Sequence, residues 1–188
     1  MLWERQALTR ARYVAGTPKL GERFLQMVHE VVYAQALTDA EWKEIRRMRA
    51  RIEKERGNAA QPELEFKTGA GGLVDTEFLV QALQLRHGHA HRQLRTAHTL
   101  AALNRLTALG VLEDEESYNL RRHYLFLRKV ESVLRRDEDT GVSSLPSDPV
   151  AQERLAKRLG YGHGPELLRH CQGAMAQNRK IYEKRMGL

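Results

Sequence analysis

The chain has 188 residues with a formal net charge of +7, and 41% of its residues are hydrophobic. This length can bury a sizeable core, and the composition is typical of a soluble globular protein. No apolar run reaches the roughly 20 residues of a membrane span, and no charged-then-apolar leader indicates secretion. The single cysteine, Cys171, excludes an internal disulfide and fits a reducing cytoplasm, and we expect it to be a buried small residue.

The basic excess permits an acidic partner, such as a nucleotide, a nucleic acid or an acidic protein surface. Many arginines nevertheless have an acidic residue three or four positions away, as Arg135 has Glu131, so most of these charges are expected to solvate helices. The arginines at 46, 47, 49 and 51 are spread around their helix without interleaved aromatic residues, and we do not expect nucleic-acid binding.

Helical patterns dominate and strand patterns are almost absent, so we predict an all-α fold, a mostly antiparallel helical bundle. Residues 1–188 are expected to form a single domain. The first predicted helix covers about Leu2 to Val14, and the break at Gly16-Thr17-Pro18 separates it from a second helix from about Leu20 to Ala36. Apolar side chains form one stripe on the second helix, at Phe24, Met27, Val28, Val31 and Val32.

The third predicted helix begins at a capping box, in which Thr38 caps the helix and Glu41 reaches back. Gly57 is expected to close it. The segment from Gly57 to Gly72 is irregular, with a short extended piece predicted at Glu63-Leu64-Glu65-Phe66. The apolar side chains of the third predicted helix are Trp42, Ile45, Met48 and Ile52, which share one face. Those of the helix after Gly72 are Leu73, Val74, Phe78, Leu79, Val80, Ala82, Leu83 and Leu85.

The helix after Gly72 is apolar nearly all round, which predicts burial on most sides. A histidine-rich link at residues 87–91 precedes a short helix from about Thr96 to Leu109. Glu113-Asp114 starts a long helix to about Arg136, with acids at its start and arginines at its end. A polar loop from Asp137 to Asp148 follows. The last two helices begin at Pro149 and Pro165, and Gly160 is expected to end the first of them.

The most informative segment is the glycine loop, which runs from Lys67 through Gly69, Gly71 and Gly72 into the next helix. Glycines allow a close backbone approach, and a helix start offers unpaired N–H groups and partial positive charge. This pattern predicts either an anion site or tight docking onto another element. The spacing fits neither the Walker loop nor the dinucleotide fingerprint, and a purely structural tight turn is the competing interpretation.

The loop resembles a family signature. Lys67, Gly69, Gly71, Gly72, Leu73, Asp75 and Glu77, with Phe78 and Gln81, are similar to the motif of the glutamine synthetase adenylyltransferases and of the uridylyltransferases that modify the nitrogen-regulatory signal protein. Residues 3–12 resemble the helix that follows the nucleotidyltransferase domain in that family. Residues 125–135, Leu145-Pro146 and residues 181–183 also match. Gln6-Ala7-Leu8 and Val74-Asp75 look more like the C-terminal, adenylylating half than the deadenylylating one.

The resemblance implies a helical domain of an enzyme that moves AMP from ATP onto a tyrosine of glutamine synthetase, with magnesium in the parent enzyme. The implied partners are its own nucleotidyltransferase domain, glutamine synthetase and a nitrogen-regulatory signal protein. The family's chemistry needs a Gly-Ser-x-x-Asp-x-Asp motif, which this sequence lacks; Asp137-Glu138-Asp139 has no such glycine. We therefore expect no catalytic residue in this chain, no activity alone, and a fragment of a larger enzyme, with the natural status of Met1 left open.

Six residues are predicted to face the cleft: Lys67, Gly69, Gly71, Gly72, Asp75 and Glu77. Asp75 and Glu77 are separated by about 200° around a helix, so they cannot both face one ligand. Which of the two faces the cleft stays open. Lys67 is the nearest basic partner in sequence for either acid, or a point charge for a phosphate.

Other chemistry finds little support in the sequence. His87, His89, His91 and His98 invite a metal site, but no cysteine or Glu-x-x-His pair accompanies them, so no metal site is predicted. No nucleophile elbow occurs. Two alternatives to the adenylyltransferase interpretation remain. One is the equivalent domain of a uridylyltransferase or of the deadenylylating half, and the other is a free-standing basic helical binding module.

Overall fold

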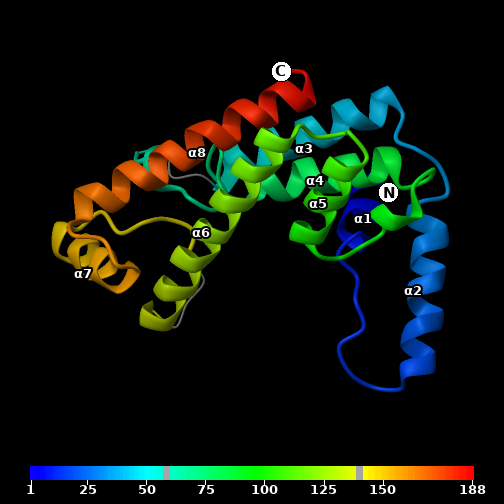
Figure 1. Cartoon of the computed structure of the whole chain (residues 1–188), viewed down its shortest axis with the longest axis horizontal. Helices are drawn as coiled ribbons and strands as arrows, with labels where there is room; N and C mark the ends of the chain where they lie inside the picture. Colours follow the sequence, from blue (N-terminus) through cyan, green and yellow to red (C-terminus); the bar gives the residue numbers. More distant parts are fainter. Residues whose placement is uncertain (57–59, 139–141) are drawn as a thin grey trace. The chain divides into compact units, whose positions relative to one another are not determined.

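A computed structural model describes residues 1–56, 60–138 and 142–188, and the described part is all-α, as predicted (Figure 1). Its α-helices are α1 (Leu2–Leu8), α2 (Pro18–Val32), α3 (Asp39–Arg56), α4 (Leu73–His87), α5 (Thr99–Ala108), α6 (Asp114–Glu138), α7 (Pro149–Leu159) and α8 (Gly164–Met186). Two short 3₁₀ turns, η1 (Pro62–Leu64) and η2 (Arg92–Leu94), lie between them. None of these helices is long and apolar enough to cross a bilayer.

The described residues divide into two compact units. Unit 1 comprises Met1–Met48 and Glu77–Ser117, and unit 2 comprises Arg49–Thr76 and Tyr118–Leu188. Each is described separately below. The prediction of a single domain stays a prediction.

Several predicted helix ends are confirmed by their capping contacts. The Thr38 N–H donates to Glu41 Oε2 at 2.9 Å and the Glu41 N–H donates to Thr38 Oγ1 at 3.2 Å, which completes the capping box. At α7, Asp148 accepts the Ala151 N–H at 2.8 Å, and Gly160 ends the helix with a left-handed φ of 87°. The predicted end at Gly57 lies outside the described residues.

Two predicted helices are shorter than expected. Helix α1 ends at Leu8, because the amides of Thr9, Arg10 and Ala11 bond three residues back instead of four. Helix α2 ends at Val32. The Arg5 guanidinium there donates to the Val32 carbonyl at 3.2 Å and to the Gln35 carbonyl at 2.9 Å, which satisfies the orphan carbonyls of the helix end.

The extended piece predicted at Glu63–Phe66 is wrong. Residues 62–64 form the 3₁₀ turn η1, in which the Leu64 N–H donates to Gln61 and the Glu65 N–H to Pro62. Pro62 occupies the first position of this turn, where its missing N–H costs nothing. Pro62 therefore starts a tight turn where we expected extended chain.

Helix α4 is as buried as its sequence predicts. Leu79, Val80, Ala82 and Leu85 in unit 1 have almost no exposed surface, and Leu73 in unit 2 is also buried. The core of unit 2 combines large apolar side chains from the loop and from α6 and α8: Phe66, Leu127, Val130, Leu167, Cys171 and Tyr182. Cys171 is fully buried as expected, and burial raises the pKa of its thiol to about 12.

Only part of the stripe predicted on α2 is buried. Val28 and Val32 are covered, but Leu20, Phe24, Met27 and Val31 are 67%, 47%, 54% and 57% exposed. We call these four residues the α2 apolar face. Their spacing of four, three and four residues aligns them along one side of the helix. A contiguous exposed apolar patch of this kind more often marks an interaction surface than a helix face that stays in contact with solvent.

Candidate functional site

The glycine loop is held against the backbone of α8 within unit 2. Gly71 has a left-handed φ of 72°, and a β-carbon there would lie 1.8 Å from the Met175 carbonyl oxygen. A β-carbon at Gly72 would lie 2.5 Å from the Phe66 oxygen, and one at Gly69 would lie 2.4 Å from the Glu65 oxygen. The three glycines are therefore required for packing, whatever else the loop does.

The amides at the start of α4 are not free, contrary to our expectation from sequence. The Leu73 N–H donates to the Phe66 carbonyl and the Val74 N–H donates to the Lys67 carbonyl, both at 3.0 Å, while the Asp75 N–H reaches Gly72 at 3.2 Å. The loop folds back and uses these donors itself. The start of this helix thus lacks the open amides that an anion site of the usual kind requires.

Asp75 lies fully buried behind the loop. Its Oδ1 is 2.5 Å from Arg49 Nε, and its Oδ2 accepts the Gly71 N–H at 2.6 Å and the Arg179 Nη1 at 3.3 Å. Burial raises the pKa of the Asp75 carboxyl, while Arg49, the Gly71 amide and Arg179 oppose that shift. This carboxylate joins α3, the loop, α4 and α8 of unit 2.

Arg49 is the partner that the sequence analysis missed, since it was assigned to a solvated helix surface. Its guanidinium is also buried, and Nη2 donates to the Thr68 carbonyl at 3.0 Å and to the Gly69 carbonyl at 2.9 Å. A signal was present in the spacing. Residue 49 falls between Ile45 and Ile52 on the apolar face of α3, where a charge must be paired.

A second buried carboxylate, Glu131 of α6, holds Lys67. Glu131 is 3% exposed, and its oxygens lie 3.0 Å from Lys67 Nζ and 2.6 Å from Arg128 Nη1, with Arg135 Nε at 3.6 Å. The side chain of Lys67 is 31% exposed. The single negative charge of Glu131 thus binds three cations, so these four side chains together carry a net positive charge beside the loop. We call Lys67, Arg128, Glu131 and Arg135 the Lys67 cluster.

Asp75 and Glu77 take different partners, as their angular separation on a helix predicts. Glu77, in unit 1, lies 3.6 Å from Arg10 Nη1, and Arg10 also donates to Thr99 Oγ1 at 2.9 Å. Glu77 is partly exposed, whereas Asp75 has no exposed surface. The geometry therefore brings Lys67, the glycines and Asp75 together in unit 2. Whether any of the six predicted residues faces a cleft stays a prediction.

The loop has one further anchor that sequence reasoning did not find. Asn178 of α8 donates from Nδ2 to the Gly71 carbonyl at 3.1 Å, and its Oδ1 accepts from His123 Nδ1 at 2.9 Å. His123 and Asn178 are both buried. Burial lowers the pKa of His123 and favours its neutral form. Neither residue stands out in sequence, because a polar residue on a long helix is normally exposed.

The chain matches a known protein family over most of its length. Residues 39–185 match the family described as GlnD PII-uridylyltransferase. The chain belongs to this family. Its signature glycine loop and the residues that anchor it all fall within the matched region.

Individual curated relatives are named as adenylyltransferases and not as uridylyltransferases. The chain is 39% identical over 166 residues to the bifunctional glutamine synthetase adenylyltransferase/adenylyl-removing enzyme of Streptomyces avermitilis, covering 87% of this chain and 17% of the relative. It is 42% identical over 161 residues to the enzyme of the same name from Stenotrophomonas maltophilia, covering 85% of this chain and 17% of the relative. The counterpart in Acinetobacter baylyi is 34% identical over 161 residues. The chain therefore spans about one sixth of the length of the curated relatives it matches.

Among the described residues, no group of three histidine, cysteine, aspartate or glutamate side chains is placed to hold a metal ion. His89 of the histidine-rich link instead contacts the Tyr33 carbonyl through Nδ1 at 3.2 Å.

Proposed function

We propose that this chain is the helical domain of an adenylyltransferase that moves AMP from ATP onto glutamine synthetase. The domain positions the nucleotidyltransferase domain and closes one wall of its cleft. The names of its relatives and its coverage of about one sixth of their length support this assignment. ATP and magnesium belong to the nucleotidyltransferase domain of the parent enzyme, and the reaction takes place in the cytoplasm.

The observation that carries this proposal is the Lys67 cluster. The underside of the glycine loop is fixed by Asp75 and Asn178, so Lys67 extends from a rigid support. Glu131 holds its ammonium group at 3.0 Å, and Arg128 adds a second cation to the same carboxylate. A preorganised positive surface of this kind stabilises phosphate charge that develops across a cleft.

The α2 apolar face supports the domain-positioning part of the proposal. Four large apolar side chains along one side of a helix form a surface that would dock on another apolar surface. About five sixths of each relative lies outside the matched region, and a nucleotidyltransferase domain there would supply such a surface. The α2 apolar face would then supply the binding affinity for the nucleotidyltransferase domain, while the Lys67 cluster would contribute to transfer of AMP.

Lys67→Ala in the full-length enzyme tests the assignment. We expect adenylylation turnover to fall by about tenfold or more, because one charge opposite the phosphates is lost. The unfolding temperature of the 188-residue chain should stay within about 2 °C, because Lys67 is partly exposed. Lys129→Ala is the matched control, since it removes an exposed cation from α6 outside the cluster. Wild-type turnover at all ATP and target concentrations would show that the loop is structural only.

The 188-residue chain alone should transfer no labelled AMP and hydrolyse no ATP, because its sequence lacks the aspartates that bind the nucleotide metal. Activity in purified protein would place the active site here and contradict the proposal.

The family description favours a second candidate, the equivalent domain of a uridylyltransferase. The equivalent domain of the deadenylylating half, which has the same architecture, is a third candidate. Assaying the full-length enzyme with labelled ATP and labelled UTP, against glutamine synthetase and against a nitrogen-regulatory signal protein, separates them. Labelling of glutamine synthetase from ATP supports the adenylyltransferase, and labelling of the signal protein from UTP supports the alternative. A Lys67→Ala variant that loses removal of AMP from labelled glutamine synthetase but keeps its addition supports the deadenylylating half.

A further inference from the structure

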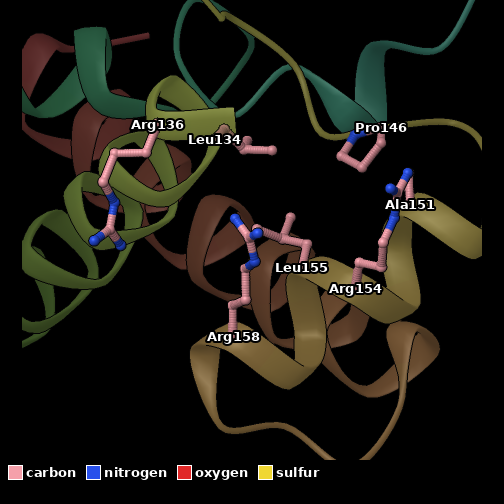
Figure 2. Close-up of a pocket in the computed structure, with 7 residues that line it drawn as sticks. All are labelled: Leu134, Arg136, Pro146, Ala151, Arg154, Leu155 and Arg158. Carbon is pink, nitrogen blue, oxygen red and sulfur yellow. The ribbon is translucent and has the colours of Figure 1, made fainter. Parts of the chain in front are cut away.

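Unit 2 contains a hollow that none of the preceding chemistry uses. It has a volume of about 440 Å³ and lies between the end of α6, the loop at Pro146 and α7 (Figure 2). We call it the arginine pocket, because three of its seven lining residues are arginines. The lining residues are Leu134, Arg136, Pro146, Ala151, Arg154, Leu155 and Arg158.

Among the described residues that line the pocket, three are cationic and none is acidic. Arg154 and Arg158 are four residues apart on α7, and both rise from that helix toward the side where Leu134 and Pro146 lie (Figure 2). Like charges at this spacing repel each other on a helix face. Slightly more than one helical turn separates these two arginines, so they place two like charges on one face of α7.

Nearby acids on α7 are used elsewhere. Asp148 accepts the Ala151 N–H at 2.8 Å, and Glu153 accepts the Gly164 N–H at 2.9 Å. Within the described residues, neither Arg136 nor Arg154 has a hydrogen bond or an ion pair. These two acids therefore bond backbone amides and form no ion pair with Arg136 or Arg154.

The floor of the pocket is apolar and fixed. Leu134 and Leu155 are almost fully buried, and Pro146 adds a rigid ring beside them. The exposed guanidinium groups lie beside this apolar floor, and their planar N–H forks match the oxygens of an anion.

We propose that the arginine pocket binds a polyphosphate group, either free or carried by a nucleotide. Arginine binds phosphate oxygens through paired N–H donors. A triphosphate carries enough negative charge to pair with both Arg136 and Arg154, whereas a single carboxylate would leave one of these two unpaired. The volume of about 440 Å³ also exceeds that of one phosphate group. This site is separate from the Lys67 cluster and does not depend on the adenylyltransferase assignment.

Isothermal titration of the 188-residue chain with inorganic triphosphate tests the proposal. We expect saturable binding that weakens as salt is added. Arg154→Ala should weaken it about tenfold, and Arg154→Ala combined with Arg136→Ala should weaken it further. Lys157→Ala is the matched control, because it removes an exposed cation from α7 without touching the pocket. Since these arginines are exposed, unchanged circular dichroism should accompany every variant.

A further arm with ATP identifies the source of the phosphate. ATP binding more tightly than triphosphate indicates a nucleotide that uses the apolar floor, and equal affinity indicates the polyphosphate alone; both results support the pocket.

Three results would overturn the proposal. The first is an absence of triphosphate binding at millimolar concentration in low salt. The second is an equal loss of affinity in Lys157→Ala and Arg154→Ala, which would mean non-specific charge attraction. The third is a loss of affinity in Lys67→Ala with none in Arg154→Ala, which would place the phosphate at the Lys67 cluster.

Discussion

Asp75 and Glu131 are both buried carboxylates of unit 2, yet they are enclosed in different ways. Asp75 contacts two guanidiniums and a backbone amide, and its main partner Arg49 is as buried as it is. Glu131 contacts cations that all reach solvent. The first arrangement seals a charge inside the fold, and the second uses a buried charge to position surface cations. Burial alone therefore does not separate a structural acid from one that serves a site.

The largest effect is expected at Asp75. Asp75→Ala leaves the buried Arg49 with only the partly exposed Glu53, 3.2 Å from its Nη1, as a counter-charge, so the free energy of unfolding should fall by about 3–5 kcal/mol. Urea denaturation of the 188-residue chain measures this. Adding Arg49→Met should recover part of the loss, because both charges are then gone. A loss below about 1 kcal/mol for Asp75→Ala would show that the pair is not sealed.

A smaller effect is expected at the loop itself. Gly71→Ala places a β-carbon 1.8 Å from the Met175 carbonyl and requires a left-handed residue, so about 2–3 kcal/mol should be lost. Gly173→Ala on α8 is the matched control, because a β-carbon there meets nothing within 4 Å. It should stabilise the chain by about 0.5–1 kcal/mol through helix propensity. Equal effects at the two glycines would contradict the close packing of the loop on α8.

Glu131→Gln sharpens the comparison with Asp75. The amide keeps the shape and leaves Lys67, Arg128 and Arg135 free to reach water, so stability should fall by only about 1 kcal/mol. Turnover of the full-length enzyme should fall more clearly, because Lys67 is no longer held in place. The stability loss comes from urea denaturation and the turnover from adenylylation assays. A stability loss as large as that of Asp75→Ala would remove the distinction between the two acids.

The smallest expected effect depends on pH. Burial lowers the pKa of His123 in the folded state below its unfolded value of about 6.5. The unfolded chain therefore binds this proton first as pH falls below about 6.5, and stability is lost from there down to the folded pKa. His123→Gln should flatten the stability change between pH 7 and pH 5. An unchanged pH profile would mean that His123 is solvated.

The sequence predicted the helices well where local chemistry decides them. The capping box at Thr38, the buried α4 and the left-handed end at Gly160 all follow from neighbouring residues. The need for glycine in the loop was also predictable. The pattern could not identify the element that the loop packs against, because Met175 of α8 is about a hundred residues from Gly71 in the chain.

Long-range pairing explains the remaining differences. Arg49 was interpreted as a solvated charge and Asp75 as an acid that faces a cleft. Their pairing inside unit 2 is what makes the burial of both charges acceptable. The α2 stripe looked like a single apolar surface, but α2 has more apolar surface than unit 1 covers. The Lys67 cluster needed the position of Glu131, which lies 64 residues downstream of Lys67 in the printed sequence.

The anchoring of the glycine loop by α8 also has a consequence for how the chain folds. Arg179 and Asn178 reach Asp75 and Gly71 across sequence separations of 104 and 107 residues. Contacts between such distant segments form slowly, because a long stretch of chain must first be ordered. During synthesis, Asp75 leaves the ribosome well before Arg179 does. Until α8 arrives, Asp75 lacks Arg179 and the Gly71 carbonyl lacks Asn178, so the loop is expected to complete its packing late in folding.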